Sequence, residues 1–224
     1  MHGLRKFVQG NLAEPWKDDW ANQEQADSNE LELDYQQGDL KGEFRIMGVD
    51  TQTDSFWFIV RGFDRDGNSY LVDFGQVASF AELDITYDLH KCHSAIIDCA
   101  GDRTSEVYEE VFKRRSRWFG SRGWKNLQGE QPYRMQMKDP FTGDTKGRGG
   151  RSKIRYLHVN KTIYEEELAR LRSRQLSGFF TFTDTSQVYY DQLFSTYWTK
   201  ETDRSGHIKT CLLYTSDAAD EWWG

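Results

Sequence analysis

Hydrophobic residues in the first half of the chain fall into short runs that alternate with clusters of turn-forming residues. Residues 43–49, 55–61 and 69–75 are rich in β-branched and aromatic side chains, which favour strands. A turn is expected at 51–54, and Asp66-Gly67 marks another because glycine tolerates positive φ. The pattern therefore predicts three antiparallel strands joined by hairpins, a meander.

The pattern then changes from a strand period to a helical one and back. Apolar side chains at Phe80, Leu83 and Tyr87 predict a helix over 80–90. The apolar run 94–98 predicts a fourth strand. Because a helix precedes this strand, we expect it to return to the sheet parallel to the first one.

A second helix is predicted to begin at Thr104, which suits an N-cap, and to bury Val107, Tyr108 and Val111. The rest of the chain predicts a basic loop or hairpin at 130–152, strands at 123–129, 154–159 and 178–182, and helices at 163–176 and 186–194. This order of elements is that of an RNase H-like fold. We therefore expect an α/β fold with a mixed sheet, in which an antiparallel three-strand meander is joined to parallel strands and flanked by helices.

Two of the predicted strands end in an aspartate, Asp50 after the first apolar run and Asp98 after the fourth. If these strands are neighbours, the two carboxylates lie at one edge of the sheet, where they repel unless a cation compensates. Carboxylate oxygens bind Mg²⁺ or Mn²⁺, and two such ions can activate water for phosphodiester hydrolysis. The alternative is that aspartate simply suits a turn. The pattern predicts Asp50 and Asp98 as metal ligands and catalytic residues.

Further acids lie near this pair in the sequence, but they suit turns or helix N-termini better than a metal site. They are Asp54, Asp73, Asp102 and Glu106.

Other kinds of chemistry find little support in the sequence. The histidines and cysteines at 90–99 do not have the spacing of a zinc site. Three cysteines in all favour a reducing compartment over a disulfide framework. The chain has neither a Gly-x-Ser-x-Gly elbow nor a Walker A loop, so a nucleotide-driven motor is not expected in it. It also has no apolar run long enough to span a bilayer.

The net charge of −7 is distributed unevenly. Residues 1–112 hold 9 Lys and Arg against 23 Asp and Glu, 113–174 hold 17 against 6, and 175–224 hold 3 against 7. Acids that hold a cation beside a basic region that meets phosphates would suit a metal-dependent enzyme acting on a polyanion. Surface charge that happens to cluster is the alternative.

The basic region offers two sets of candidate DNA contacts. Phosphate binding needs only charge and reach, so a solvated basic loop is the alternative for both. The first set lies in a glycine-rich stretch and comprises Lys146, Arg148, Arg151 and Lys153, with Arg155 beyond it. The second set follows the second predicted helix and comprises Lys113, Arg114, Arg115 and Arg117.

Four short motifs, in the right order, resemble large terminase subunits of the GpA type. Phe7–Trp16 resembles the segment that leaves the ATPase half of those proteins, and Gly48–Asp54 resembles the run that opens their nuclease half. Ile97–Tyr108 is similar to the second acidic strand. Gly123–Gly129 resembles a strand that ends in Lys-Gly in the family, but Gln128 stands where Lys is usual.

The resemblance implies an RNase H-like nuclease that uses a divalent metal to cut concatemeric phage DNA during genome packaging. It gives Asp50 and Asp98 the role of ligands for Mg²⁺ or Mn²⁺. It also implies double-stranded DNA as the substrate, the terminase small subunit and portal as partners, the host cytoplasm as the location, and no membrane association.

The chain departs from the family near its C-terminus. The family's third carboxylate lies in an Asn-His-x-x-Asp-type stretch after a pattern seen here at Tyr189–Leu193, and no such stretch follows. Cys211–Glu221 resembles one reading frame of a common sequencing adapter, so native sequence is expected to stop near Thr210. We expect cutting to be impaired, because two carboxylates seldom fix two ions.

These observations predict three parts: a linker from an ATPase domain absent here (1–42), an RNase H-like nuclease domain (43–210), and a non-native tail (211–224). The first alternative to a nuclease is a non-catalytic DNA-binding module on the same fold. Another RNase H-fold nuclease, such as a resolvase or integrase, is a further alternative that the Phe7–Trp16 motif disfavours.

Overall fold

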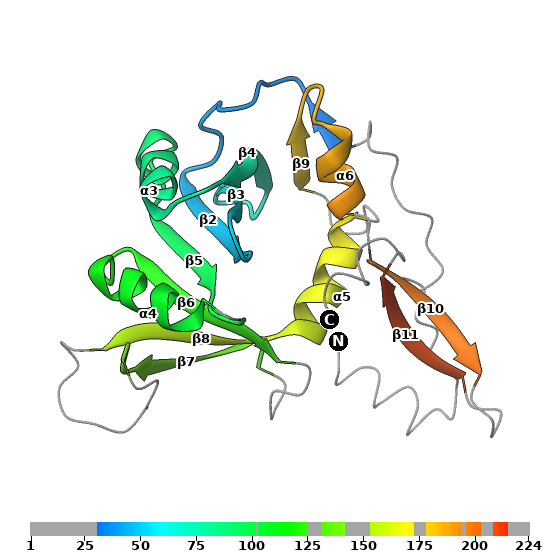
Figure 1. The fold of residues 1–224 in the computed structure, drawn as a ribbon. Helices are drawn as coiled ribbons and strands as arrows, with labels where there is room; N and C mark the ends of the chain where they lie inside the picture. The colour runs from blue at the N-terminus through cyan, green and yellow to red at the C-terminus, as the bar shows by residue number, and fades with distance from the viewer. Residues whose placement is uncertain are drawn as a thin grey trace.

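The computed structural model describes residues 31–101, 103–124, 131–141, 153–172, 178–193, 196–202 and 208–214. Its main feature is a mixed nine-stranded sheet with the strand order β1-β9-β4-β3-β2-β5-β6-β8-β7 (Figure 1). Strands β10 (Thr196–Thr202) and β11 (Ile208–Tyr214) form a separate antiparallel pair. None of the helices in the described part of the chain combines the length and the apolar character needed to cross a bilayer.

The antiparallel meander consists of β2 (Phe44–Thr51), β3 (Phe56–Phe63) and β4 (Ser69–Val77). Its chain reversals are tight, as the sequence predicts: in the second, the side chain of Asp64 accepts hydrogen bonds from the backbone N–H groups of Asp66 and Asn68. Along β2, Met47 and Val49 are buried in alternation, because one face packs against helices and the main core, whereas β4 buries the adjacent Leu71 and Val72 in the clusters on its two faces.

The parallel half of the sheet extends from β2. β5 (Ser94–Asp98) pairs in parallel with β2, and β6 (Trp118–Trp124) and β8 (Ile154–Asn160) follow in parallel. β7 (Tyr133–Lys138) closes this side as an antiparallel edge strand, within the sequence predicted as a basic loop or hairpin. At the other side, β9 (Phe179–Phe182) and the two-residue β1 (Glu32–Leu33) add in parallel beyond β4.

Helices cover both faces of the sheet (Figure 1). α3 (Phe80–Leu89) and α4 (Thr104–Lys113) lie on one face, while α5 (Lys161–Arg172) and α6 (Gln187–Leu193) lie on the other. The first face encloses a core that includes Met47, Val49, Ala95, Ile97, Val107, Val111 and Trp118. The second encloses a smaller, aromatic-rich cluster of Leu31, Tyr35, Leu71, Phe179, Phe182, Tyr189 and Tyr190. The prediction of an α/β fold with a mixed, RNase H-like sheet is therefore confirmed.

Two details of the predicted elements differ in the structure. The strand predicted to begin at Gly123 begins at Trp118, because α4 ends early enough for Trp118 to enter the core, where it is fully buried. Residues 125–129 of the predicted strand lie outside the described residues. The N-cap of α4 is Arg103, whose side chain makes no capping bond. The Thr104 hydroxyl instead donates to the carbonyls of Cys99 and Gly101, which fixes the chain between β5 and α4.

Residues ahead of the meander also contribute to the folded unit. Leu31 and Tyr35 are buried, and the Tyr35 hydroxyl donates to the carbonyl of Leu71 over 2.9 Å. The segment 31–35, within the predicted linker, thus packs against the sheet.

Candidate active site

The two aspartates lie at the carboxyl ends of neighbouring parallel strands. β2 and β5 pair from Ile46–Ser94 to Val49–Ile97, with partners 48 positions apart, and the next step of this register aligns Asp50 with Asp98. Adjacent strands lie about 4.8 Å apart, so both side chains leave the sheet at the same level. The Thr51 hydroxyl also donates to the Asp98 carbonyl over 2.9 Å, which ties the two strand ends together.

Strand alternation directs both carboxylates away from the main core. Val49 and Ile97, the residues before them, are buried on the α3–α4 face. Asp50 and Asp98 therefore point to the opposite face, where Ile59 of β3 and Leu168 of α5 pack against the aromatic-rich cluster. The sequence prediction that distant acids meet at one end of the sheet agrees with this register.

Burial raises the pKa of both carboxyl groups. For Asp50, a hydrogen bond from Gln52 opposes this rise in pKa, and the charge of Asp98 adds to it. For Asp98, the backbone N–H of Ala100 and then the charge of Lys161 hold the pKa down in part. The ionised pair is thus disfavoured in the absence of a compensating cation, which is the electrostatic condition for a metal site.

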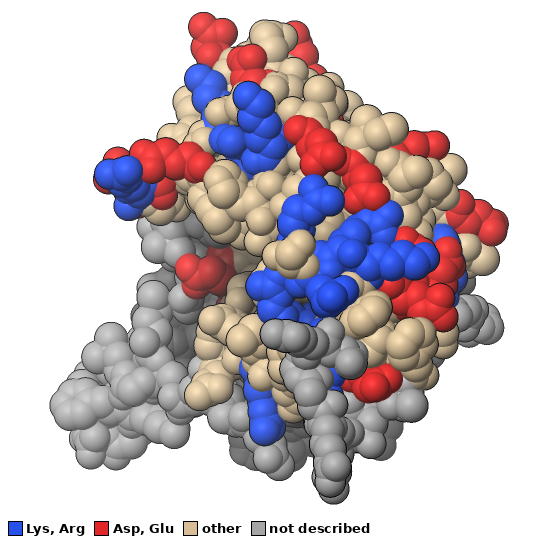
Figure 2. All heavy atoms as spheres, turned by 90° about the vertical axis from the view of Figure 1, so that its left-hand side faces the viewer, with Lys and Arg blue, Asp and Glu red and all other residues tan. Residues whose placement is uncertain are grey.

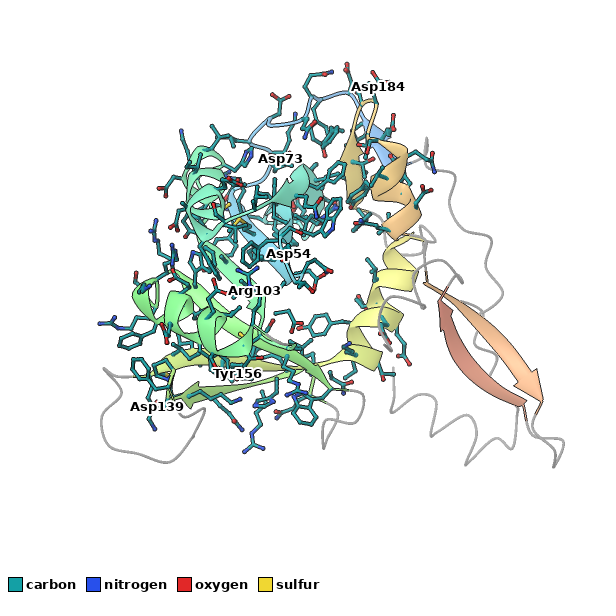
Figure 3. The ribbon with its side chains drawn as sticks, viewed as in Figure 1. Asp54, Asp73, Arg103, Asp139, Tyr156 and Asp184 are labelled. Atoms are coloured by element: carbon teal, nitrogen blue, oxygen red, sulfur yellow. The ribbon has the colours of Figure 1, made fainter. Side chains whose placement is uncertain are left out.

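The loop after Asp50 is held by contacts with the start of α4. Gln52 Nε2 donates to Asp50 Oδ2 over 2.5 Å, and Arg103 Nη1 donates to the Gln52 carbonyl over 3.4 Å. Arg103 also forms a two-point ion pair with Glu106. Figure 3 places Asp54 close to Arg103 at this end of the sheet, and the charge of Asp54 contributes to the raised pKa of Arg103. Asp54 and Glu106 thus face an arginine rather than the acid pair.

Two basic side chains that the sequence analysis did not single out lie near the acids. Lys161 is the first residue of α5, directly after β8, and its charge lowers the pKa of both aspartates. Of the two aspartates, the charge of Arg122 on β6 lowers the pKa of Asp98 alone, and by less than that of Lys161 does. A search of strand ends for cations as well as acids would have found Lys161.

The donors present suit a hard cation. Within the described residues, no group of three or more His, Cys, Asp and Glu side chains is placed to hold a metal, so the chain supplies two carboxylates here. Mg²⁺ is commonly bound in this way, by one or two carboxylates with water and substrate phosphates completing its shell. The neighbouring thiol of Cys99 is 1% exposed and donates to the Ile97 carbonyl, so this soft ligand does not point into the site. Asp50 and Asp98 therefore fit Mg²⁺ or Mn²⁺ better than zinc.

Most of the predicted DNA contacts in the glycine-rich stretch cannot be placed. Lys146, Arg148 and Arg151 lie outside the described residues. Lys153 is described and is 9% exposed, directly before β8. Asp102, one of the accessory acids, also lies outside the described residues.

The second basic set, at the end of α4, is occupied by contacts within the protein. Arg114 pairs with Asp84 of α3 and with Glu110, and Lys113 also pairs with Glu110. Arg117 reaches Asp88 over 3.1 Å. On the side that carries α3 and α4, basic side chains accordingly gather with acidic ones among them (Figure 2). This cluster lies by the start of β6, at the opposite end of the parallel strands from Asp98.

The remaining titratable candidates have structural partners. Asp73 Oδ2 lies 2.7 Å from His90 Nε2, and Gln37 donates to the other carboxylate oxygen. Burial raises the pKa of Asp73, but the hydrogen bonds from His90 and Gln37 outweigh it and hold the pKa below its usual value. His93 Nδ1 accepts a hydrogen bond from the backbone N–H of Arg45. These groups fix α3 and β5 to the meander.

The chain matches the model of a known protein family over most of its length. Residues 2–89 and 86–209 match the family described as terminase large subunit gpA, endonuclease domain. The first matched segment contains Asp50 and the second contains Asp98. A comparison with curated proteins gave no match.

Proposed function

The chain belongs to the endonuclease-domain family of gpA-type terminase large subunits. From this premise we propose that it cleaves DNA with Mg²⁺ or Mn²⁺, and that Asp50 and Asp98 bind the metal. The observation that supports the proposal is the register of β2 and β5, which aligns two partly buried carboxylates on the same face of the sheet. Burial makes the ionised form of each carboxyl group less favourable than in water. A bound divalent cation would stabilise the ionised form and so offset this unfavourable free energy.

Each residue of the site has one proposed role. Asp50 and Asp98 hold the cation, and Gln52 orients Asp50 through its hydrogen bond. A divalent cation in this position supplies the charge that activates water and stabilises the leaving oxygen of a phosphodiester. Because the described residues offer two carboxylates, we expect cleavage to be slow.

The proposed substrate is double-stranded concatemeric DNA in the host cytoplasm, with the terminase small subunit and portal as partners during packaging. The proposed DNA contacts include the glycine-rich stretch with Lys146, Arg148, Arg151 and Lys153. The alternative is that the two acids are purely structural, in which case the chain would bind DNA without cleaving it.

Plasmid nicking in Mn²⁺ distinguishes these possibilities. We expect the full chain to convert supercoiled plasmid slowly to open circles, and Asp50→Asn to reduce the rate at least about 100-fold, because removal of a ligand costs at least as much as removal of an outer-shell partner. Asp54→Asn is the matched control: it makes the same chemical change in the same loop, at an exposed acid that faces Arg103.

Calorimetric titration with Mn²⁺ completes the experiment. Heat of binding that is lost in both Asp50→Asn and Asp98→Asn supports the metal site. Equal nicking by the unaltered chain and Asp50→Asn, or DNA binding that neither needs nor responds to metal, would overturn the proposal in favour of the non-catalytic module.

A further inference from the structure

The register of β8 with β6 places the side chain of Lys161 on the same face of the sheet as the two acids. β8 is in register with β6, with Gly123 opposite Val159 and Trp124 opposite Asn160, and Lys161 follows at once. β6 in turn aligns Ser121 with Asp98. Because side chains alternate along a strand, Ser121 and Gly123 share the face to which Asp98 points. Lys161 lies over that same face, as its contact with Gly123 shows.

The stem of Lys161 rests directly on Gly123. A Cβ atom added at Gly123 would lie 2.2 Å from Lys161 Cε, 2.7 Å from Cγ and 2.9 Å from Cδ. No other residue type fits beneath the stem unless the lysine moves. The absence of a side chain at 123 therefore leaves room for the stem of Lys161 to lie against this face of the sheet.

The ammonium group is near the carboxylates but is not bound to them. Among the described residues, no ion pair within 4.0 Å joins Lys161 to Asp50 or Asp98. Its charge nonetheless lowers the pKa of both aspartates, and Lys161 is exposed. A lysine whose purpose was to neutralise the pair would be expected to contact it. This one makes no such contact.

We propose that Lys161 is a further catalytic residue, which binds a phosphate oxygen of the DNA strand that lies across Asp50 and Asp98. The inference rests on the proposed nuclease function and adds the residue that holds the phosphate beside the metal ligands. Lysine binds phosphate as a point charge on a flexible stem, and Gly123 leaves space for that stem against the sheet. The two acids repel DNA, so a cation at this place is needed to seat the backbone against them.

Arg122 provides the matched control. It carries the same charge and also lies near Asp98, but it stands between Ser121 and Gly123 and so leaves β6 on the opposite face. Its guanidinium lies 5.3 Å from the centre of the Trp124 ring. If proximity of positive charge were all that mattered, Arg122→Gln and Lys161→Gln would weaken DNA binding equally.

The test measures DNA binding apart from cleavage. The full chain and the variants Lys161→Gln, Lys161→Arg, Gly123→Ala and Arg122→Gln are titrated into a fluorescent duplex in Ca²⁺, an oxygen-binding cation used in place of Mn²⁺, at several salt concentrations. For Lys161→Gln we expect affinity to fall about five- to tenfold at 0.1 M salt, and the slope of log affinity against log salt to decrease by about one, as for loss of one phosphate contact. Lys161→Arg restores most of the affinity. Gly123→Ala resembles Lys161→Gln, and Arg122→Gln changes affinity by less than about twofold.

Mn²⁺ calorimetry separates failure of this inference from failure of the nuclease proposal. Lys161→Gln is expected to bind Mn²⁺ at least as tightly as the unaltered chain, because a competing cation is removed, whereas Asp50→Asn loses binding. If Asp50→Asn loses Mn²⁺ binding but Lys161→Gln binds DNA normally with an unchanged salt slope, Lys161 has no role at the phosphate. If Asp50→Asn binds Mn²⁺ like the unaltered chain, the metal site itself is wrong.

Discussion

The two ends of the parallel strands use charge in opposite ways. At the amino end, by the start of β6, Arg114 contacts Asp84 and Glu110 and also lies over the rings of Phe80 and Trp118. At the carboxyl end, Asp50 and Asp98 share one face with a lysine that pairs with neither. Charged side chains that form ion pairs hold helices to a sheet, whereas charged side chains without an ion pair remain available to a ligand.

This difference changes the interpretation of charge in the sequence. The run Lys113–Arg117 is the densest basic cluster in the described chain, yet Lys113, Arg114 and Arg117 are each paired with an acid. Lys161 stands between a strand and a helix with no other basic residue beside it. On the proposal that Lys161 binds a phosphate, the position of a charge at a strand end is a better guide to a polyanion site than the density of charge along the sequence.

Removal of the Arg114 charge is expected to cause the largest change in stability among the variants that test this comparison. Arg114→Met keeps the apolar stem against Trp118 but leaves Asp84 and Glu110 without their cation. The Arg114 side chain is 14% exposed, so we expect a loss of about 2–3 kcal/mol in the free energy of unfolding, measured by urea denaturation. DNA affinity should be unchanged. A large loss of DNA binding without a loss of stability would show that the amino end also binds DNA.

The pH dependence of stability should have opposite signs at the two ends. Burial raises the pKa of Asp50, so this group opposes folding at neutral pH, and the cost disappears as the pH falls through the raised pKa towards 3.8. Burial also raises the pKa of Glu110, but hydrogen bonds from Lys113 and Arg114 outweigh it and lower the pKa below 4.5. Glu110 therefore stabilises the fold above pH 4.5, and this contribution is lost as the pH falls through the lowered pKa.

Urea denaturation of two isosteric variants in metal-free buffer measures that contrast. At pH 7, Asp50→Asn is expected to be more stable than the unaltered chain and Glu110→Gln less stable, each by roughly 1 kcal/mol. Both differences should shrink as the pH falls: that of Asp50→Asn towards pH 3.8, and that of Glu110→Gln only as the pH passes through the lowered pKa of Glu110. A stabilising difference for Asp50→Asn that persists unchanged at pH 3 would contradict the assignment to ionisation.

The smallest effect is expected from Arg115→Ala. Arg115 is exposed, and its guanidinium lies over the ring of Phe112 and donates to a backbone carbonyl of its own turn. We expect stability to change by less than about 0.5 kcal/mol, and DNA affinity by less than about twofold. A reduction of DNA affinity comparable to that of Lys161→Gln, in the same fluorescence assay, would move part of the DNA path to the amino end.

The sequence predicted what depends on local pattern and on strand ends. The meander, the strand 94–98 and its parallel return beside the first strand follow from apolar runs and the intervening helix, and all are present. The alignment of Asp50 with Asp98 needs only that these strands be neighbours in register. These predictions succeeded because a buried strand has one stable register, set by the residues on its inner face.

What the sequence did not predict depends on contacts between elements. β6 starts at Trp118 because that indole is buried against α3 and α4, a contact that strand propensity does not encode. Arg114 and Asp84, which lie 30 positions apart in the sequence, pair between the end of α4 and α3, so local pattern did not show that the basic run has acidic partners. The place of Lys161 over Gly123 depends on β8 lying beside β6, which the predicted order of elements did not specify.

The inner face of β5 has a consequence for how this protein can tolerate change. Ala95 and Ile97 are buried in the core, and they alternate with Ile96 and Asp98 on the outer side. One extra residue between Ser94 and Asp98 would turn the acid inwards and an isoleucine outwards. Length changes there should abolish the site even where the strand survives, while the exposed turn around Gly67 offers a place for insertions.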